Sequence, residues 1–75
     1  MKKADHNVIP NNFMFIKAVQ LSDTNAGKIN DIWHIYKNDY GLLGLNKRTG
    51  KYYYIFRSHL RIKEQWQILK IEKGA

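Results

Sequence analysis

The fold of this chain is decided by residues 58–73, which read SHLRIKEQWQILKIEK. Over residues 60–68, apolar side chains alternate with polar ones, with Glu64 as the only exception, a pattern typical of a half-buried strand. The apolar positions are Leu60, Ile62, Trp66 and Ile68, and the polar positions between them include Arg61, Lys63, Gln65 and Gln67. In a helix the same apolar residues would fall on two separate arcs, so no single apolar stripe would form. The alternation therefore favours a strand.

Helix propensity argues the other way for the same stretch. It contains several good helix formers, and Ser58 is a suitable residue to cap a helix start. A strand is favoured because tertiary packing often overrides propensity, and a helix stays open as the alternative. The apolar parity changes between Ile68 and the pair Leu69 and Ile71. A strand here therefore needs a bulge, or must be buried on both faces.

Upstream of this stretch, short apolar runs are separated by clusters of turn-forming residues. The runs that predict strands, from their β-branched, aromatic and aliphatic content, are residues 13–21, 32–36, 42–45 and 51–56. A polar loop that closes in Gly50 joins the last two runs, which predicts a hairpin with Gly50 at a positive-φ position. Gly44, inside one arm, predicts a bulge or a place where another backbone or a ligand comes close.

These elements predict a mainly β protein. We expect a small antiparallel sheet of about five short strands, curled or barrel-like, with an SH3-like or OB-like architecture. The alternative is a three- to four-stranded sheet with one C-terminal helix, which applies if residues 58–73 are helical. Residues 12–75 are expected to form a single small domain. Residues 1–11 are mostly polar and predict a flexible N-terminal arm.

The composition excludes several classes of protein. A chain of 75 residues has room for one thin hydrophobic core. It contains no cysteine, which excludes disulfides, thiolate metal sites and a cysteine nucleophile, and predicts a cytoplasmic location. The apolar runs are far shorter than the about 20 residues that cross a bilayer, so no membrane partner is expected.

Catalytic and metal-binding patterns are absent from the sequence. There is no glycine-rich phosphate loop and no His-Glu-x-x-His motif. The three histidines, His6, His34 and His59, have no cluster of ligands at metal-binding spacing. Ser58 precedes His59, but no acid nearby in the sequence would orient that histidine as a base. We therefore expect no enzymatic activity, no metal and no cofactor.

Positive charge is concentrated in the second half of the chain. The net charge is +7, and residues 47–75 contribute +6, with eight basic residues against Glu64 and Glu72. The basic residues are Lys47, Arg48, Lys51, Arg57, Arg61, Lys63, Lys70 and Lys73. This asymmetry is typical of a surface that faces a polyanion. A charged face that only keeps a small domain soluble is the alternative.

Aromatic residues are interleaved with this charge in the run 51–57. Strand alternation places Tyr52, Tyr54 and Phe56 on one face of the run, with Tyr53, Ile55 and Arg57 on the other. If the Tyr53 face is buried, the opposite ladder becomes an exposed platform on which unpaired bases can stack. If the Phe56 face is buried, the ladder belongs to the core. Both alternatives are open at the level of sequence.

The preferred hypothesis is a non-catalytic nucleic-acid-binding module that uses a basic hairpin and an aromatic strand. Basic residues at the hairpin tip and on the polar side of the last segment would bracket a phosphate backbone. The predicted binding residues are Lys47, Arg48, Lys51, Tyr52, Tyr53, Tyr54, Arg57, Arg61 and Lys63. The type of nucleic acid stays open.

Two other hypotheses follow from the same features. A basic surface suits an acidic protein partner, so the chain would be a small protein-binding module. Such a module would be a phage or mobile-element inhibitor of a host nucleic-acid-handling enzyme. Self-association is the third hypothesis, in which an unpaired edge strand such as residues 13–21 pairs across a two-fold axis to form a homodimer.

Overall fold

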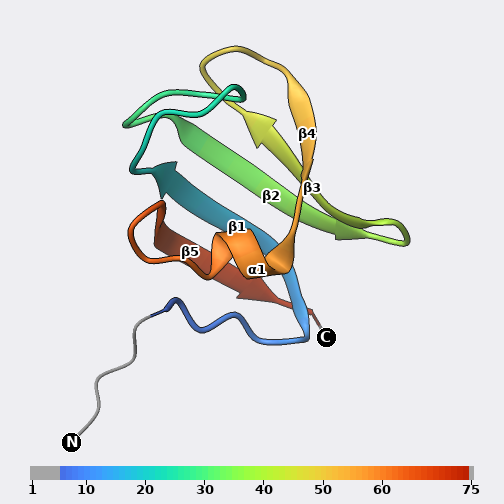
Figure 1. Ribbon diagram of the computed structural model, residues 1–75. Helices are drawn as coiled ribbons and strands as arrows, with labels where there is room; N and C mark the ends of the chain where they lie inside the picture. The colour runs from blue at the N-terminus through green and yellow to red at the C-terminus, as the bar shows by residue number, and fades with distance from the viewer. Residues whose placement is uncertain (1–5, 75) are drawn as a thin grey trace, which may run out of the picture.

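Five strands and one short helix make up the fold in the computed structural model, which describes residues 6–74. The elements are β1 (Phe13–Gln20), β2 (Ile32–Asn38), β3 (Gly41–Asn46), β4 (Tyr52–Ile55), α1 (Arg57–Leu60) and β5 (Trp66–Lys73). The strands form one antiparallel sheet in the order β4-β3-β2-β1-β5, and α1 lies over one face of it (Figure 1). The predicted mainly β fold class is confirmed. The sheet stays open, because β4 and β5 are its two edges.

Residues 58–73 contain both a helix and a strand. Leu60 donates its backbone N–H to the carbonyl of Phe56 at 3.2 Å, which closes the single turn of α1. Trp66 donates to the carbonyl of Ile62 at 3.1 Å, so the chain turns again before β5 begins. Leu60 and Trp66 are both buried, as the alternation predicted. The helical turn of α1 and the turn before β5 bury them, and a continuous strand does not. The prediction of a continuous strand over residues 60–68 is therefore wrong before Trp66.

The parity change in β5 is accommodated by a bulge, one of the two solutions that the sequence allowed. Lys17 of β1 lies opposite Lys70, and the next residue, Ala18, lies opposite Ile68. Leu69 is therefore the extra residue, and it is 46% exposed. The bulge returns Ile68 to the core side of the sheet.

A second irregularity changes the parity of β1. Phe13 lies opposite Lys73 and Phe15 lies opposite Glu72, so Met14 is the extra residue. Phe13 is consequently buried, whereas Phe15 is only partly covered. The sequence predicted that these two phenylalanines share a face, and the bulge separates them. Alternation of side chains holds only where the ladder is continuous.

The hydrophobic core lies between α1 and the covered face of the sheet. Its buried residues are Phe13, Ile16, Ala18, Trp33, Ile35, Leu42, Leu60 and Trp66. Leu60 is the residue that α1 contributes, and it is fully buried. This single turn of helix covers part of the curved sheet (Figure 1).

Gly50 has the role that the sequence predicts, whereas Gly44 makes room for side chains and not for a bulge, a backbone or a ligand. Gly50 has a φ of 76° in the loop between β3 and β4, a conformation that favours glycine. Gly44 is a site of close approach, since a Cβ there would lie 2.5 Å from Cδ1 of Ile55 and 3.0 Å from Cε3 of Trp33. The ladder between β2 and β3 is continuous at Gly44, so the bulge alternative is wrong.

The N-terminal segment runs beside α1 and the start of β5 (Figure 1). Of the predicted arm, residues 1–5 lie outside the described part of the chain. The side-chain amide of Asn7 donates hydrogen bonds to the carbonyls of Leu60, at 3.1 Å, and Trp66, at 3.0 Å. Its backbone N–H donates to the carbonyl of Arg61 at 2.7 Å. Asn7 thus ties the end of α1 to the start of β5.

The edge strands differ from the predicted one. β1 pairs with β2 on one side and with β5 on the other, so residues 13–21 do not form an edge. The prediction that residues 13–21 form an unpaired edge is therefore wrong, and a homodimer through an edge strand stays a prediction. The last strand, β5, pairs with the edge of β1 that β2 leaves free, so β4 and β5 are the edges of the sheet.

Candidate nucleic-acid interface

The sheet has a second face, opposite the core, which we call the outer face. Its members follow from the strand registers and from the alternation of side chains. They are Phe15, Lys17 and Val19 of β1, Ile32, His34 and Tyr36 of β2, Leu43 and Leu45 of β3, Tyr52 and Tyr54 of β4, and Gln67, Lys70 and Glu72 of β5. Because α1 packs on the other side, solvent reaches these residues.

One continuous row crosses the outer face from β1 to β4. Phe15 lies opposite Tyr36, Tyr36 opposite Leu43, and Leu43 opposite Tyr54. The rings of Phe15 and Tyr36 have centroids 5.3 Å apart at an angle of 49°. Tyr36 is 42% exposed and Tyr54 is 60% exposed. The row therefore presents apolar surface across four strands, with three aromatic residues and one leucine.

A parallel row combines aromatic surface with positive charge. Lys17 lies opposite His34, His34 opposite Leu45, and Leu45 opposite Tyr52. Burial lowers the pKa of His34, and the charges of Lys47 and then Lys17 lower it further. The imidazole is therefore uncharged at neutral pH, and the two lysines carry the positive charge around it.

The two sides of β4 settle which of its aromatic residues are exposed. Tyr53 packs on the core, with its ring centroid 5.7 Å from that of Trp33, and Ile55 packs on the same side. Tyr52 and Tyr54 are each 60% exposed on the outer face. The exposed-ladder alternative is correct for these two tyrosines. Phe56 does not continue the ladder, because its ring lies edge-on against His59 of α1, with centroids 5.4 Å apart.

Arg48, at the hairpin tip, is held by a buried carboxylate. Its Nε donates to Oδ1 of Asp31 at 2.6 Å, and Asp31 is 4% exposed. Oδ2 of Asp31 accepts hydrogen bonds from the backbone N–H of Lys28 at 2.8 Å and from Nδ2 of Asn46 at 2.9 Å. These bonds join the hairpin tip to the loop before β2. Arg48 therefore has a structural role, with half of its side chain exposed.

This network makes the stability of the fold depend on pH. Hydrogen bonds from Arg48, then Lys28, then Asn46 hold the pKa of the Asp31 carboxyl well below its ordinary value of 3.8. A carboxyl whose pKa is lower in the folded state than in the unfolded state stabilises the fold. Its full contribution is present above the pKa of the unfolded state and is lost as the pH falls through the pKa of the folded state.

We expect the urea midpoint of the protein to fall as the pH is lowered from about 5 to about 2. The variant Arg48→Gln should be less stable at neutral pH and should lose less stability across that window, because the main cause of the low pKa of Asp31 is gone. Arg61→Gln removes an equal charge at an exposed position away from Asp31 and is the control. Equal acid slopes for Arg48→Gln and the unmodified protein would contradict this account.

The structure does not gather the predicted binding residues into one surface. Tyr52 and Tyr54 lie on the outer face. The three basic residues of the hairpin tip lie in the loop between β3 and β4, and they are Lys47, Arg48 and Lys51. Tyr53 is on the core side. Arg57 lies at the far end of β4, where its Nη1 donates to Oδ1 of Asn11 at 2.9 Å.

The two basic residues of the last segment are on the other side of the fold. Arg61 and Lys63 lie in the turn between α1 and β5, and β5 is the edge opposite β4. They therefore do not adjoin the hairpin tip in the way that a strand over residues 60–68 would have placed them.

The sequence reasoning missed several members of the outer face. Phe15, Lys17, His34, Tyr36 and Leu43 extend the aromatic surface beyond β4. A signal for them existed, because apolar residues occupy both parities in the runs that became β1 and β2. A strand with apolar residues on both faces predicts a sheet with apolar surface on both sides.

Comparisons of the chain with models of known protein families, with curated proteins and with solved structures find no match. Within residues 6–74, no helix is long and apolar enough to cross a membrane. The same residues contain no group of three or more histidine, aspartate or glutamate side chains placed to hold a metal ion. The geometry of the chain itself therefore has to carry the functional argument.

Proposed function

We propose that this protein is a non-catalytic nucleic-acid-binding module that holds unpaired bases on the outer face of its sheet. The observation that carries the proposal is the pair Tyr52 and Tyr54, each 60% exposed on a face that also carries Lys17, with Lys47 in the loop directly after β3. Exposed tyrosines beside lysines provide the two interactions that a single strand requires, stacking for its bases and charge for its phosphates.

The arrangement favours single strands over duplexes. A duplex hides the faces of its bases, whereas a single strand can lay successive bases on the aromatic rows of Tyr36, Tyr52 and Tyr54. Lys17 lies opposite His34 in one of these rows, and the charge of Lys47, in the loop after β3, also acts on His34, so both lysines can attract the phosphates of a strand bound there. Lys70, at the β5 side, already pairs with Glu72 at 3.0 Å and contributes less charge. The net charge of +7 adds a long-range attraction for any polyanion.

Fluorescence anisotropy with labelled single-stranded DNA, single-stranded RNA and duplex DNA tests the proposal. We expect micromolar binding of single strands in about 50 mM salt, and a loss of affinity of about ten-fold or more in about 200 mM salt. Duplex DNA should bind more weakly. Absence of binding at low salt, or tighter binding of the duplex, would overturn the proposal.

Removal of the two exposed tyrosines should weaken binding strongly. The double variant Tyr52→Ala with Tyr54→Ala is expected to lose at least about ten-fold in affinity for single strands, because each stacked base contributes about 1–3 kcal/mol. Tyr40→Ala is the control, since Tyr40 is 86% exposed but lies in the turn between β2 and β3. It should bind as the unmodified protein does. Equal losses in both variants would place the binding site elsewhere.

A protein-binding module is the second candidate, and one observation favours it. Val19, Ile32, Leu43 and Leu45 give the outer face aliphatic surface that bases use poorly but that protein interfaces bury. A protein partner would be held by these residues and by a few aromatic anchors, so its affinity would change little with salt. The salt titration therefore separates the two candidates.

A further inference from the structure

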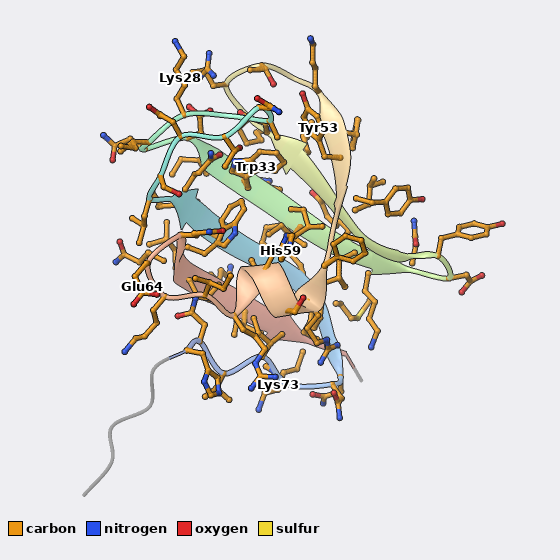
Figure 2. The ribbon with its side chains drawn as sticks, in the orientation of Figure 1. Lys28, Trp33, Tyr53, His59, Glu64 and Lys73 are labelled. Carbon is orange, nitrogen blue, oxygen red and sulfur yellow. The ribbon has the colours of Figure 1, made fainter. Side chains whose placement is uncertain are left out.

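The core side of the sheet contains a hollow, which is separate from the binding surface proposed on the outer face. It has a volume of about 400 Å³, within the range of small-ligand sites, and it opens between the loop of residues 22–26, β4 and α1. Figure 2 shows Trp33, Tyr53 and His59 around this space. Trp66 completes its aromatic wall, with a ring centroid 5.6 Å from that of Trp33.

The lining of the hollow is aromatic and carries no fixed charge. None of the described residues that line it is a lysine, arginine, aspartate or glutamate. A phosphate would find no cation here, and an ammonium group would find no carboxylate. The occupant that fits is therefore uncharged.

Hydrogen-bonding groups stand free at the rim of the hollow. Among residues 6–74, the side-chain amides of Asn25 and Gln65 make no hydrogen bond to the protein. The indole N–H of Trp66 also has no protein partner, and it reaches solvent, because no buried polar side-chain atom of the described chain is unpaired. In contrast, the indole N–H of Trp33 donates to Oε1 of Gln20 at 2.9 Å.

We propose that this hollow is a pocket for a nucleobase, which stacks on its aromatic wall and hydrogen-bonds through its edge to Asn25 and Gln65. A nucleobase is flat, uncharged and edged with both donors and acceptors, and two amides can match such an edge. A proline ring is also apolar and uncharged, but it has no donor or acceptor for the amides. A purine should bind more tightly than a pyrimidine, because its two rings bury more surface against Trp66 and Tyr53.

The base can belong to a free nucleoside or to a bound strand, and β4 links the pocket to the outer face. β4 is an edge strand, so Tyr53 lines the pocket from one of its sides while Tyr52 extends from the other. Tyr54, an outer-face residue, also borders the hollow. A strand that lies on the outer face can therefore pass around β4 and place one base in the pocket. This second source rests on the proposed function, whereas binding of a free nucleoside does not.

Tryptophan fluorescence is a specific probe of this pocket. The chain contains two tryptophans, Trp33 and Trp66, and both line it, whereas neither lies on the outer face. Titration with adenosine, guanosine, cytidine and uridine should quench the emission in a saturable way. For ligands of roughly twenty non-hydrogen atoms we expect dissociation constants of about 0.1–1 mM, with the purines at the lower end.

Two glutamines provide the variant and its control. Gln65→Ala should weaken nucleoside binding about five-fold, since it removes one edge hydrogen bond. Gln67→Ala makes the same truncation two residues along the chain, on the outer face, and should leave nucleoside binding unchanged. Unchanged near-ultraviolet circular dichroism in both variants shows that the packing of the tryptophans is preserved.

The outcomes separate this inference from the proposed function. If nucleosides also quench the tryptophans in the single variant Tyr52→Ala, which changes the outer face and leaves the lining of the hollow intact, the pocket is independent of that face. Quenching by nucleosides without anisotropy binding of any oligonucleotide supports the pocket and overturns the proposed function. Binding of oligonucleotides with no quenching by nucleosides at several millimolar overturns the pocket alone. Equal quenching by phenol, with no effect of Gln65→Ala, or saturable quenching by a proline-rich peptide alone, also overturns it.

Discussion

The variant Trp33→Ala is expected to lose at least about 3 kcal/mol of unfolding free energy, the usual cost of removing a buried indole. Trp33 is 1% exposed at the centre of the core, and its ring contacts those of Tyr53 and Trp66, at centroid distances of 5.7 and 5.6 Å. A domain of this size has about 4–11 kcal/mol of stability in total. The cavity would therefore remove a large share of it.

Urea unfolding followed by far-ultraviolet circular dichroism measures this loss. Phe56→Ala is the control, because it also removes an aromatic ring, but one that is 71% exposed. We expect it to change the unfolding free energy by less than about 0.5 kcal/mol. If Trp33→Ala fails to fold, Trp33→Phe keeps most of the ring and leaves Oε1 of Gln20 without its donor, at a cost of about 1–3 kcal/mol. A Trp33→Phe variant as stable as the unmodified protein would contradict the role assigned to Trp33.

Elements that depend on neighbouring residues were predictable from the sequence. The strand runs and the loop that closes in Gly50 follow from alternation and from turn chemistry, and both agree with the structure. The close packing at Gly44 was predictable only in part, because the glycine indicated a bulge, a backbone or a ligand, whereas the side chains of Ile55 and Trp33 approach it.

The helix at residues 57–60 was beyond prediction because distant residues stabilise it. Asn7 donates to the carbonyls of Leu60 and Trp66, which lie 53 and 59 positions away in the chain. These bonds satisfy backbone groups at the end of α1 and at the start of β5. Neither alternation nor propensity contains that information. The sequence therefore left a choice between a strand and a helix, whereas the chain forms one turn of helix and then a strand.

The candidate site was predictable only in part, because contacts with distant residues decide which side chains are exposed. The exposed tyrosines of β4 were one of two alternatives, and the choice required knowing that Tyr53 packs on Trp33. Arg48 was assigned to phosphate from local charge alone, whereas it pairs with Asp31, 17 residues earlier. The aromatic rows of the outer face required the strand register, which connects Phe15 to Tyr54 through two intervening strands.

Replacing Gly27 by alanine should destabilise the fold by about 2 kcal/mol or more, because the site has no room for a methyl group. A Cβ there would lie 2.5 Å from Oε1 of Gln20, 2.6 Å from Nδ2 of Asn46 and 2.8 Å from Oδ2 of Asp31. All three are buried and hydrogen-bonded to one another or to nearby groups. No neighbour can move without leaving a buried polar atom unpaired, and this makes the substitution costly.

Thermal or urea unfolding of Gly27→Ala beside Gly74→Ala tests this expectation. A Cβ at Gly74 would lie 3.1 Å from Cγ of Met14, which is 61% exposed and can move aside, and 3.3 Å from the backbone oxygen of Asn12, so we expect a clearly smaller loss there than at Gly27. The two variants add the same methyl group, and they differ in whether the atoms around it can yield. A Gly27→Ala variant of unchanged stability would show that the Asp31 network relaxes freely, and the acid sensitivity assigned to Asp31 would then be lost with it.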